Sequence, residues 1–198
     1  MKVGTGHYIC LLNSDVLVND RWLTKMVVAL EADPRNQIVN PATNNTAQID
    51  IPMAAGASYI TMNSVLEKYA KRRYPEIMPT GFCFMFKREL IGKIGYFDEA
   101  FQNYGEESDW WMRCVTFAEN GQFKKYRAIM ADDTYLFHER GTSFSALGQS
   151  THMSLRNSAA GRFHAVWPQY GNWAKAFKPA ITLGNLRQAI PNREINSI

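Results

Sequence analysis

The chain has 198 residues, of which 46% are hydrophobic and 20% charged, a composition that predicts one soluble globular domain and excludes a largely disordered chain. Its net charge of +4 suits an enzyme that handles diphosphates. The basic residues form no long block, so no nucleic-acid partner is expected. Three widely spaced cysteines predict neither a disulfide framework nor a zinc cluster. Without an 18-residue apolar stretch or a signal-peptide pattern, a cytoplasmic location is expected.

Short apolar runs predict buried strands, and apolar residues at helical spacing predict helices between them. Pro41 is expected to stop the second strand, Asn63 to cap the second helix, and Gly121 to end the fourth. The resulting mixture predicts an α/β layer architecture. In chain order the expected elements are strand Tyr8–Leu12, helix Asp20–Ala32, strand Gln37–Asn40, a long loop Ala42–Asn63, helix Asn63–Tyr69, strand Phe82–Phe86, helix Arg88–Lys93, helix Glu106–Glu119, strands Lys124–Met130 and Tyr135–His138, and one or two helices between Thr151 and Phe177.

The first motif is Asn13-Ser14-Asp15, which follows the first predicted strand. In extended chain, Asn13 and Asp15 point to the same side and can converge on one ligand. The carboxyl ends of strands are where open α/β sheets bind ligands, and an aspartate there can share Mg²⁺ or Mn²⁺ with a diphosphate. The same three residues also suit a plain turn.

The second motif is Glu106-Glu107-Ser108-Asp109, at the start of a predicted helix. Acidic residues in a first helical turn are favoured by the helix dipole alone. The alternative is catalytic, because transfer of a sugar to a hydroxyl needs a carboxylate that takes the hydroxyl proton. Glu106 and Asp109 share a helix face, whereas Glu107 faces elsewhere.

Two further signals are weaker on their own. His138 ends a predicted strand, where a histidine serves as a metal ligand, a phosphate contact or an ordinary hydrogen-bonding group. Gly81, in Pro79-Thr80-Gly81-Phe82, permits a close approach of the backbone to a ligand or forms a simple turn.

Taken in order, these motifs resemble glycosyltransferase family 2, which has the GT-A fold. Gly6 to Asp15 resembles that family's strand ending in a D-x-D-type motif, and the stretch from Gly6 to Ser143 resembles the second half of its catalytic domain. Thr80-Gly81-Phe82, Gly95 to Glu99 and Tyr104 to Asp109 resemble its acceptor-side segments. His138, with Gly141 and Ser143, resembles a late metal- or phosphate-binding motif. The expected fold is a partial, Rossmann-like GT-A mixed sheet flanked by helices.

The resemblance implies an inverting transferase that uses Mn²⁺ or Mg²⁺. It assigns Asp15 to the metal, His138 to the metal or the diphosphate, and Glu107 to the role of general base. Glu106 and Asp109 would hold the acceptor or orient that base. The residues implied to contact substrate are Asn13, Thr80, Gly81, Asp98 and Trp110. The sequence departs from the family at two of these positions, because many members have aspartate in place of Asn13 and of Glu107.

The resemblance divides the chain into a catalytic half-domain, residues 1–144, and a helical extension, residues 145–198. The family's domain begins with a nucleotide-binding βαβαβ half that would precede Gly6, so a partner chain or self-association is expected to cover the missing part. The extension mixes aromatic and basic residues. We expect a helix that packs its aromatics over the sheet, with a sugar-stacking or peripheral membrane-surface face as the alternative. These residues are Arg156, Arg162, His164, Trp167, Tyr170, Trp173, Lys175, Phe177 and Lys178.

Three functions remain open from the sequence. The first is a transferase that moves a sugar from a nucleotide-diphosphate donor to a glycan or lipid-linked acceptor. The second is a truncated, non-catalytic GT-A-like module that binds a glycan or a partner chain. The third is an unrelated α/β hydrolase that uses Glu106 and Asp109.

Overall fold

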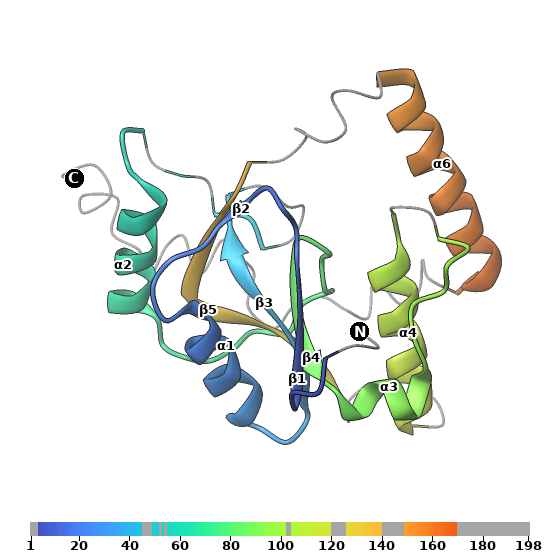
Figure 1. Ribbon diagram of the computed structural model, residues 1–198, viewed down its shortest axis with the longest axis horizontal. Helices are drawn as coiled ribbons and strands as arrows, with labels where there is room; N and C mark the ends of the chain where they lie inside the picture. Colours follow the sequence, from blue (N-terminus) through green and yellow to red (C-terminus); the bar gives the residue numbers. More distant parts are fainter. Residues whose placement is uncertain are drawn as a thin grey trace.

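The computed structural model describes residues 4–44, 49–51, 53, 55–101, 104–119, 126–139 and 149–169. A central sheet has helices on both sides, with α1 and α2 against one face and α3 and α4 on the other (Figure 1). This confirms the mixed α/β class. The elements are β1 (Tyr8–Leu12), β2 (Val16–Leu17), α1 (Trp22–Glu31), β3 (Asn36–Thr43), α2 (Tyr59–Tyr69), β4 (Cys83–Lys87), α3 (Glu89–Ile94), α4 (Glu106–Glu119), β5 (Arg127–His138) and α6 (Gln149–Val166).

The five described strands lie in the order β1-β4-β3-β5-β2, and all neighbouring pairs are antiparallel except β3 and β5. Only residues 13–15 connect β1 to β2, although these strands are at opposite ends of the order. Four interstrand spacings in a flat sheet would measure about 19 Å, whereas four residue steps reach at most about 14 Å. The sheet therefore cannot be flat, and the connection passes over the ends of the strands between β1 and β2.

Pro41 does not end the second strand as predicted, because β3 continues to Thr43. The β3–β5 register jumps here, from Pro41 opposite Ala131 to Ala42 opposite Tyr135. Proline, which has no backbone N–H, is accommodated in sheets at such irregularities. The strands predicted at Lys124–Met130 and Tyr135–His138 are likewise one bulged strand, β5.

The bulge also explains the second wrong boundary. Asn63 was predicted to cap a helix, but α2 begins at Tyr59, with Ser58 accepting a hydrogen bond from the Thr61 backbone N–H at 3.1 Å. Asn63 is buried inside α2, where its Oδ1 accepts the backbone N–H of Tyr135 at 3.0 Å. The side-chain amide thus satisfies a backbone donor at the point where the β3–β5 register shifts.

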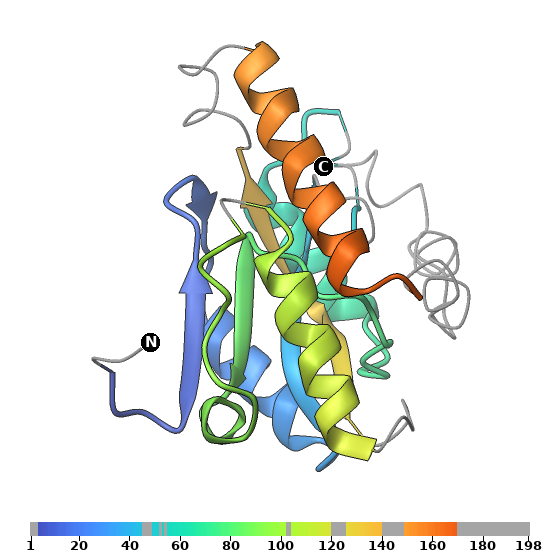
Figure 2. The same ribbon diagram turned by 90° about the vertical axis from the view of Figure 1, so that its right-hand side faces the viewer.

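The extension contributes α6, which lies beside α4 (Figure 2). Phe163 packs in a small cluster with Phe101 and with Met112 of α4, so the described part of the extension packs against α4. The predicted aromatic and basic residues beyond position 169 lie outside the described residues. Within the described ranges, no helix is both long enough and apolar enough to cross a bilayer.

Candidate functional site

The connection Asn13–Asp15 is held over the sheet by hydrogen bonds at both of its ends. The Asn13 N–H donates to the carbonyl of Phe82 at 2.9 Å, and the Glu139 N–H donates to the carbonyl of Asp15 at 3.0 Å. Phe82 directly precedes β4, and Glu139 directly follows β5. The motif that reads as a turn in the sequence therefore bonds to two remote segments, the residue before β4 and the residue after β5.

Asp15 and His138 meet at this junction. Nε2 of His138 lies 3.4 Å from Oδ1 of Asp15, and the two side chains are 11% and 15% exposed. The imidazole also stacks on the ring of Phe82, with centroids 5.3 Å apart and an interplanar angle of 24°. Its buried Nδ1 has no hydrogen-bond partner among the described residues. Asp15 is therefore the polar contact that orients the ring there.

A divalent cation is compatible with this pair. Carboxylate oxygen and imidazole nitrogen are both ligands for Mn²⁺, and Mg²⁺ commonly takes one or two carboxylates with the remaining ligands from phosphate and water. The 3.4 Å separation lets one cation contact both side chains. Among the described residues, no group of three or more His, Cys, Asp or Glu side chains is arranged to hold a metal. A cation here would therefore need oxygens from a bound ligand.

Glu107, in the first turn of α4, is the carboxylate whose ionisation is shifted most usefully for catalysis. Burial, followed by the charge of Glu106, raises its pKa from 4.5 to about 7. A backbone hydrogen bond from Gly81 opposes the shift. Burial also raises the pKa of Glu106, whose buried Oε2 has no hydrogen-bond partner in the described part of the chain. A carboxylate that titrates near neutrality is suited to accept a proton.

The turn at Gly81 and Phe82 contacts both Glu107 and the Asp15–His138 pair. A Cβ added to Gly81 would lie 3.6 Å from the carboxyl carbon of Glu107, so the backbone passes directly beside this side chain. The next residue, Phe82, contacts the other half of the site through its ring on His138 and its carbonyl on Asn13. Two adjacent residues, Gly81 and Phe82, thus contact Glu107 and His138 respectively.

Asp109 is not available as a base or an acceptor contact in this arrangement. It is buried, and its two oxygens accept hydrogen bonds from Arg113 Nε and Trp167 Nε1, both at 2.9 Å. Glu107 and not Asp109 therefore faces Gly81. Glu107 keeps the predicted role of general base. Asp109 instead connects α4 to Trp167, the residue that directly follows α6.

Two predicted substrate contacts are also placed elsewhere. Trp110 is fully buried against Phe84 and Phe86 of β4, and its Nε1 donates to the carbonyl of Gly95 at 2.9 Å. A core side chain of this kind cannot contact a dissolved substrate. Asp98 pairs with Arg162 of α6 at 2.8 Å, an interaction that lowers the pKa of the aspartate. We leave both residues out of the candidate site.

The motifs did not point to two asparagines that contact the site. Asn40, in β3, bonds both backbone groups of Thr80, and Asn44, just after β3, bonds both backbone groups of His138. In the sequence, Asn40 read as a strand end and Asn44 as part of a polar loop. No local pattern marks a polar side chain whose partners lie 40 or 94 positions away.

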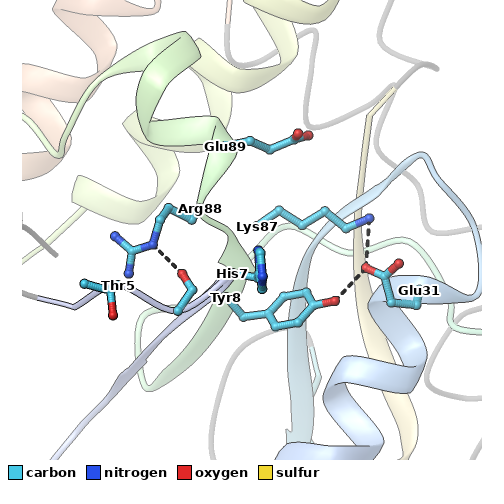
Figure 3. Close-up of a pocket in the computed structure, with 8 residues that line it drawn as sticks. Thr5, His7, Tyr8, Glu31, Lys87, Arg88 and Glu89 are labelled. Carbon is cyan, nitrogen blue, oxygen red and sulfur yellow. Dashed lines mark hydrogen bonds and ion pairs between the residues drawn. The ribbon is translucent and has the colours of Figure 1, made fainter.

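A separate hollow of about 410 Å³ lies at the opposite end of β1 (Figure 3). Some of the polar side chains that line this hollow already interact with one another. Glu31 accepts a hydrogen bond from the Tyr8 hydroxyl at 3.0 Å and forms an ion pair with Lys87 at 3.2 Å. The Lys87 ammonium is the main cause that lowers the pKa of Glu31. The hollow contains none of the predicted site residues.

No protein-family model and no curated protein sequence matches this chain. The resemblance of its motifs to glycosyltransferase family 2 therefore remains a prediction.

Proposed function

We propose that this chain is an inverting, metal-dependent glycosyltransferase of the GT-A type, which moves a sugar from a nucleotide-diphosphate donor to a hydroxyl of a glycan or lipid-linked acceptor. The observation that supports it best is the turn Gly81–Phe82. Gly81 lies beside Glu107, whose pKa burial raises to about 7, and the next residue, Phe82, stacks on His138, which pairs with Asp15. A proton acceptor and a pair of metal ligands are the two groups that the reaction needs.

In this mechanism Asp15 and His138 would hold Mn²⁺ or Mg²⁺, which would supply positive charge to the donor diphosphate. Glu107, in its ionised form, accepts the proton of the acceptor hydroxyl. The hydroxyl oxygen forms a bond to the anomeric carbon as the bond from that carbon to the diphosphate oxygen breaks. The electron pair of the broken bond leaves with the nucleotide diphosphate, and attack from the opposite face inverts the anomeric configuration. In this proposal Asn13, Thr80 and Gly81 would contact the substrates.

The test is turnover with a panel of nucleotide-diphosphate sugars, with Mn²⁺ and with candidate acceptors, measured as release of the nucleotide diphosphate. We expect turnover that depends on metal, donor and acceptor. Glu107→Gln should lower it at least about 100-fold, the usual minimum for removing a general base. Asp15→Asn should also lower it, because it weakens the proposed metal site. Matched controls are Asp20→Asn and Glu89→Gln, whose side chains are exposed.

The outcomes separate the alternatives. Turnover that survives both site substitutions would refute the assigned roles. Release of nucleotide diphosphate without an acceptor would indicate a hydrolase.

The second candidate is a non-catalytic module that binds a glycan or a partner chain. It is favoured by the outer edge of β1, where no described strand pairs, and by Leu12 at the end of β1, which is 42% exposed. Unpaired strand edges are sites where another chain can add a strand. This candidate predicts that calorimetry detects no donor binding even with Mn²⁺ present, so measurable donor affinity would count against it.

A further inference from the structure

Asn40 is a fully buried polar side chain that holds the turn beside Glu107. Its Nδ2 donates to the carbonyl of Thr80 at 2.7 Å and to the carbonyl of Cys83, and its Oδ1 accepts the Thr80 N–H at 3.2 Å. These bonds fix both ends of the segment from Thr80 to Cys83. Gly81 lies between them, and its backbone hydrogen-bonds to the Glu107 carboxylate.

Asn44 makes an equivalent contact with the other half of the site. Its Oδ1 accepts the His138 N–H at 2.7 Å, and its Nδ2 donates to the His138 carbonyl at 3.1 Å. The Asn44 side chain thus bonds both the N–H and the carbonyl of His138, the last residue of β5, as the backbone of an adjacent strand would. The contact holds the backbone from which the imidazole projects towards Asp15.

We propose that Asn40 and Asn44 are two independent positioning residues, Asn40 for the proton acceptor Glu107 and Asn44 for the metal-binding His138. This inference rests on the proposed function. Its physical basis is that one rigid strand, β3, sits in the middle of the sheet between β4 and β5. An amide with both of its polar atoms bonded holds its partner in one conformation, because breaking either bond leaves a polar group less well paired, most severely at the fully buried Asn40. β3 therefore sets the position of each half separately.

The experiment compares Asn40→Ala with Asn44→Ala in two measurements that need no turnover. The first is the pKa of Glu107 from an NMR titration of ¹³C-labelled glutamate carboxyls, with Glu107→Gln used for assignment. Glu106 is the charged neighbour that acts on this pKa, and it is unchanged in both variants. We expect Asn40→Ala to raise the pKa by about one unit through loss of the Gly81 N–H, since a hydrogen bond to a charged group is worth this much. Asn44→Ala should leave it unchanged.

The second measurement is the affinity for Mn²⁺ alone, from paramagnetic broadening of the His138 imidazole signals. Asn44→Ala should weaken binding about tenfold, the usual effect of losing a group that supports a ligand, and Asn40→Ala should leave it unchanged. The matched control is Asn36→Ala, which removes another buried asparagine of β3 whose Nδ2 donates to the Ala29 carbonyl at 2.9 Å. It should lower stability and move neither readout.

Equal effects of both variants on both readouts, or an unchanged or lowered Glu107 pKa in Asn40→Ala, would overturn the inference. If an alanine variant does not fold, Asn40→Thr and Asn44→Thr, which are uncharged and cannot make both amide hydrogen bonds, take its place and should give shifts in the same directions. Failure of the unmodified protein to bind Mn²⁺ would refute the role of Asn44 and the metal in the proposed function. The Glu107 titration would still decide the role of Asn40.

Discussion

The substitution Glu107→Gln tests whether Glu107 occupies the environment that a general base needs. Glutamine keeps the size of the side chain and an oxygen that can accept the Gly81 hydrogen bond, but it removes the ionisable group. In the folded protein, burial and Glu106 raise the pKa of Glu107 from 4.5 to about 7. Between these values the folded state holds a proton that the unfolded state has released. The free energy of unfolding therefore falls as pH rises through this window.

The size of the effect follows from the shift. Each pKa unit corresponds to 1.36 kcal/mol, so the ionised Glu107 destabilises the folded protein by roughly 3 kcal/mol. Near pH 4 the wild type carries a protonated Glu107 in both states, and the two proteins should be about equally stable. At pH 8, Glu107→Gln should be more stable by roughly 3 kcal/mol. A variant that loses activity while gaining stability is the signature of a site whose group is held in an unfavourable charge state.

Urea unfolding followed by tryptophan fluorescence at several pH values between 4 and 8 measures this difference directly. The exposed residue Glu99 provides the matched control, and Glu99→Gln should show no stability difference that varies with pH in this range. A difference between Glu107→Gln and wild type that stays constant across the range would refute the reasoning. So would a glutamine variant that is the less stable protein at pH 8.

Three further substitutions separate catalytic placement from structural support. Gly81→Ala adds a methyl group 3.6 Å from the Glu107 carboxyl carbon, an ordinary contact that excludes water. The pKa of Glu107 measured by NMR should therefore rise further, and a fall would contradict the assigned proximity. Asp109→Asn removes the charge that pairs with Arg113 and should cost about 1–3 kcal/mol in urea unfolding. It should leave the Glu107 pKa in place, and a shift in that pKa would argue against a structural role. Trp110→Ala should cost about 3–5 kcal/mol with unchanged donor affinity in the folded fraction, whereas weaker donor binding without destabilisation would restore the predicted substrate contact.

Local patterns predicted most elements because the physical cause of each lies within a few residues. Helix α4 begins and ends at the predicted residues, Glu106 and Glu119, since acidic residues favour its first turn. Strand β1 likewise matches its apolar run, Tyr8–Leu12. The positions of the candidate site residues in the fold were predictable to the same extent. Asp15, Glu107 and His138 each stand at the end of an element, where short-range rules place functional residues.

Boundaries failed where a distant segment supplied the missing partner. Pro41 remains in a strand because the facing strand is irregular there, and Asn63, inside the helix that Ser58 caps, is buried because it bonds the Tyr135 backbone. No window of sequence contains both members of either pair. The same reason explains why Asp109 and Trp110 looked functional. Their partners, Trp167 in one case and the aromatic side chains of β4 in the other, are known only once the chain is folded.

The sequence by itself determined which groups could act, namely a carboxylate and a histidine at strand ends and an acidic helix start. Only the tertiary structure decided which of them meet. The link Asn13–Asp15 is too short to join the edges of a flat sheet, so it crosses the strand ends and brings Asp15 to His138. The burial of Glu107 beside Gly81 and the amide contacts of Asn40 and Asn44 arise from the same packing. They are properties of positions far apart in the chain, and the composition of any one segment does not contain them.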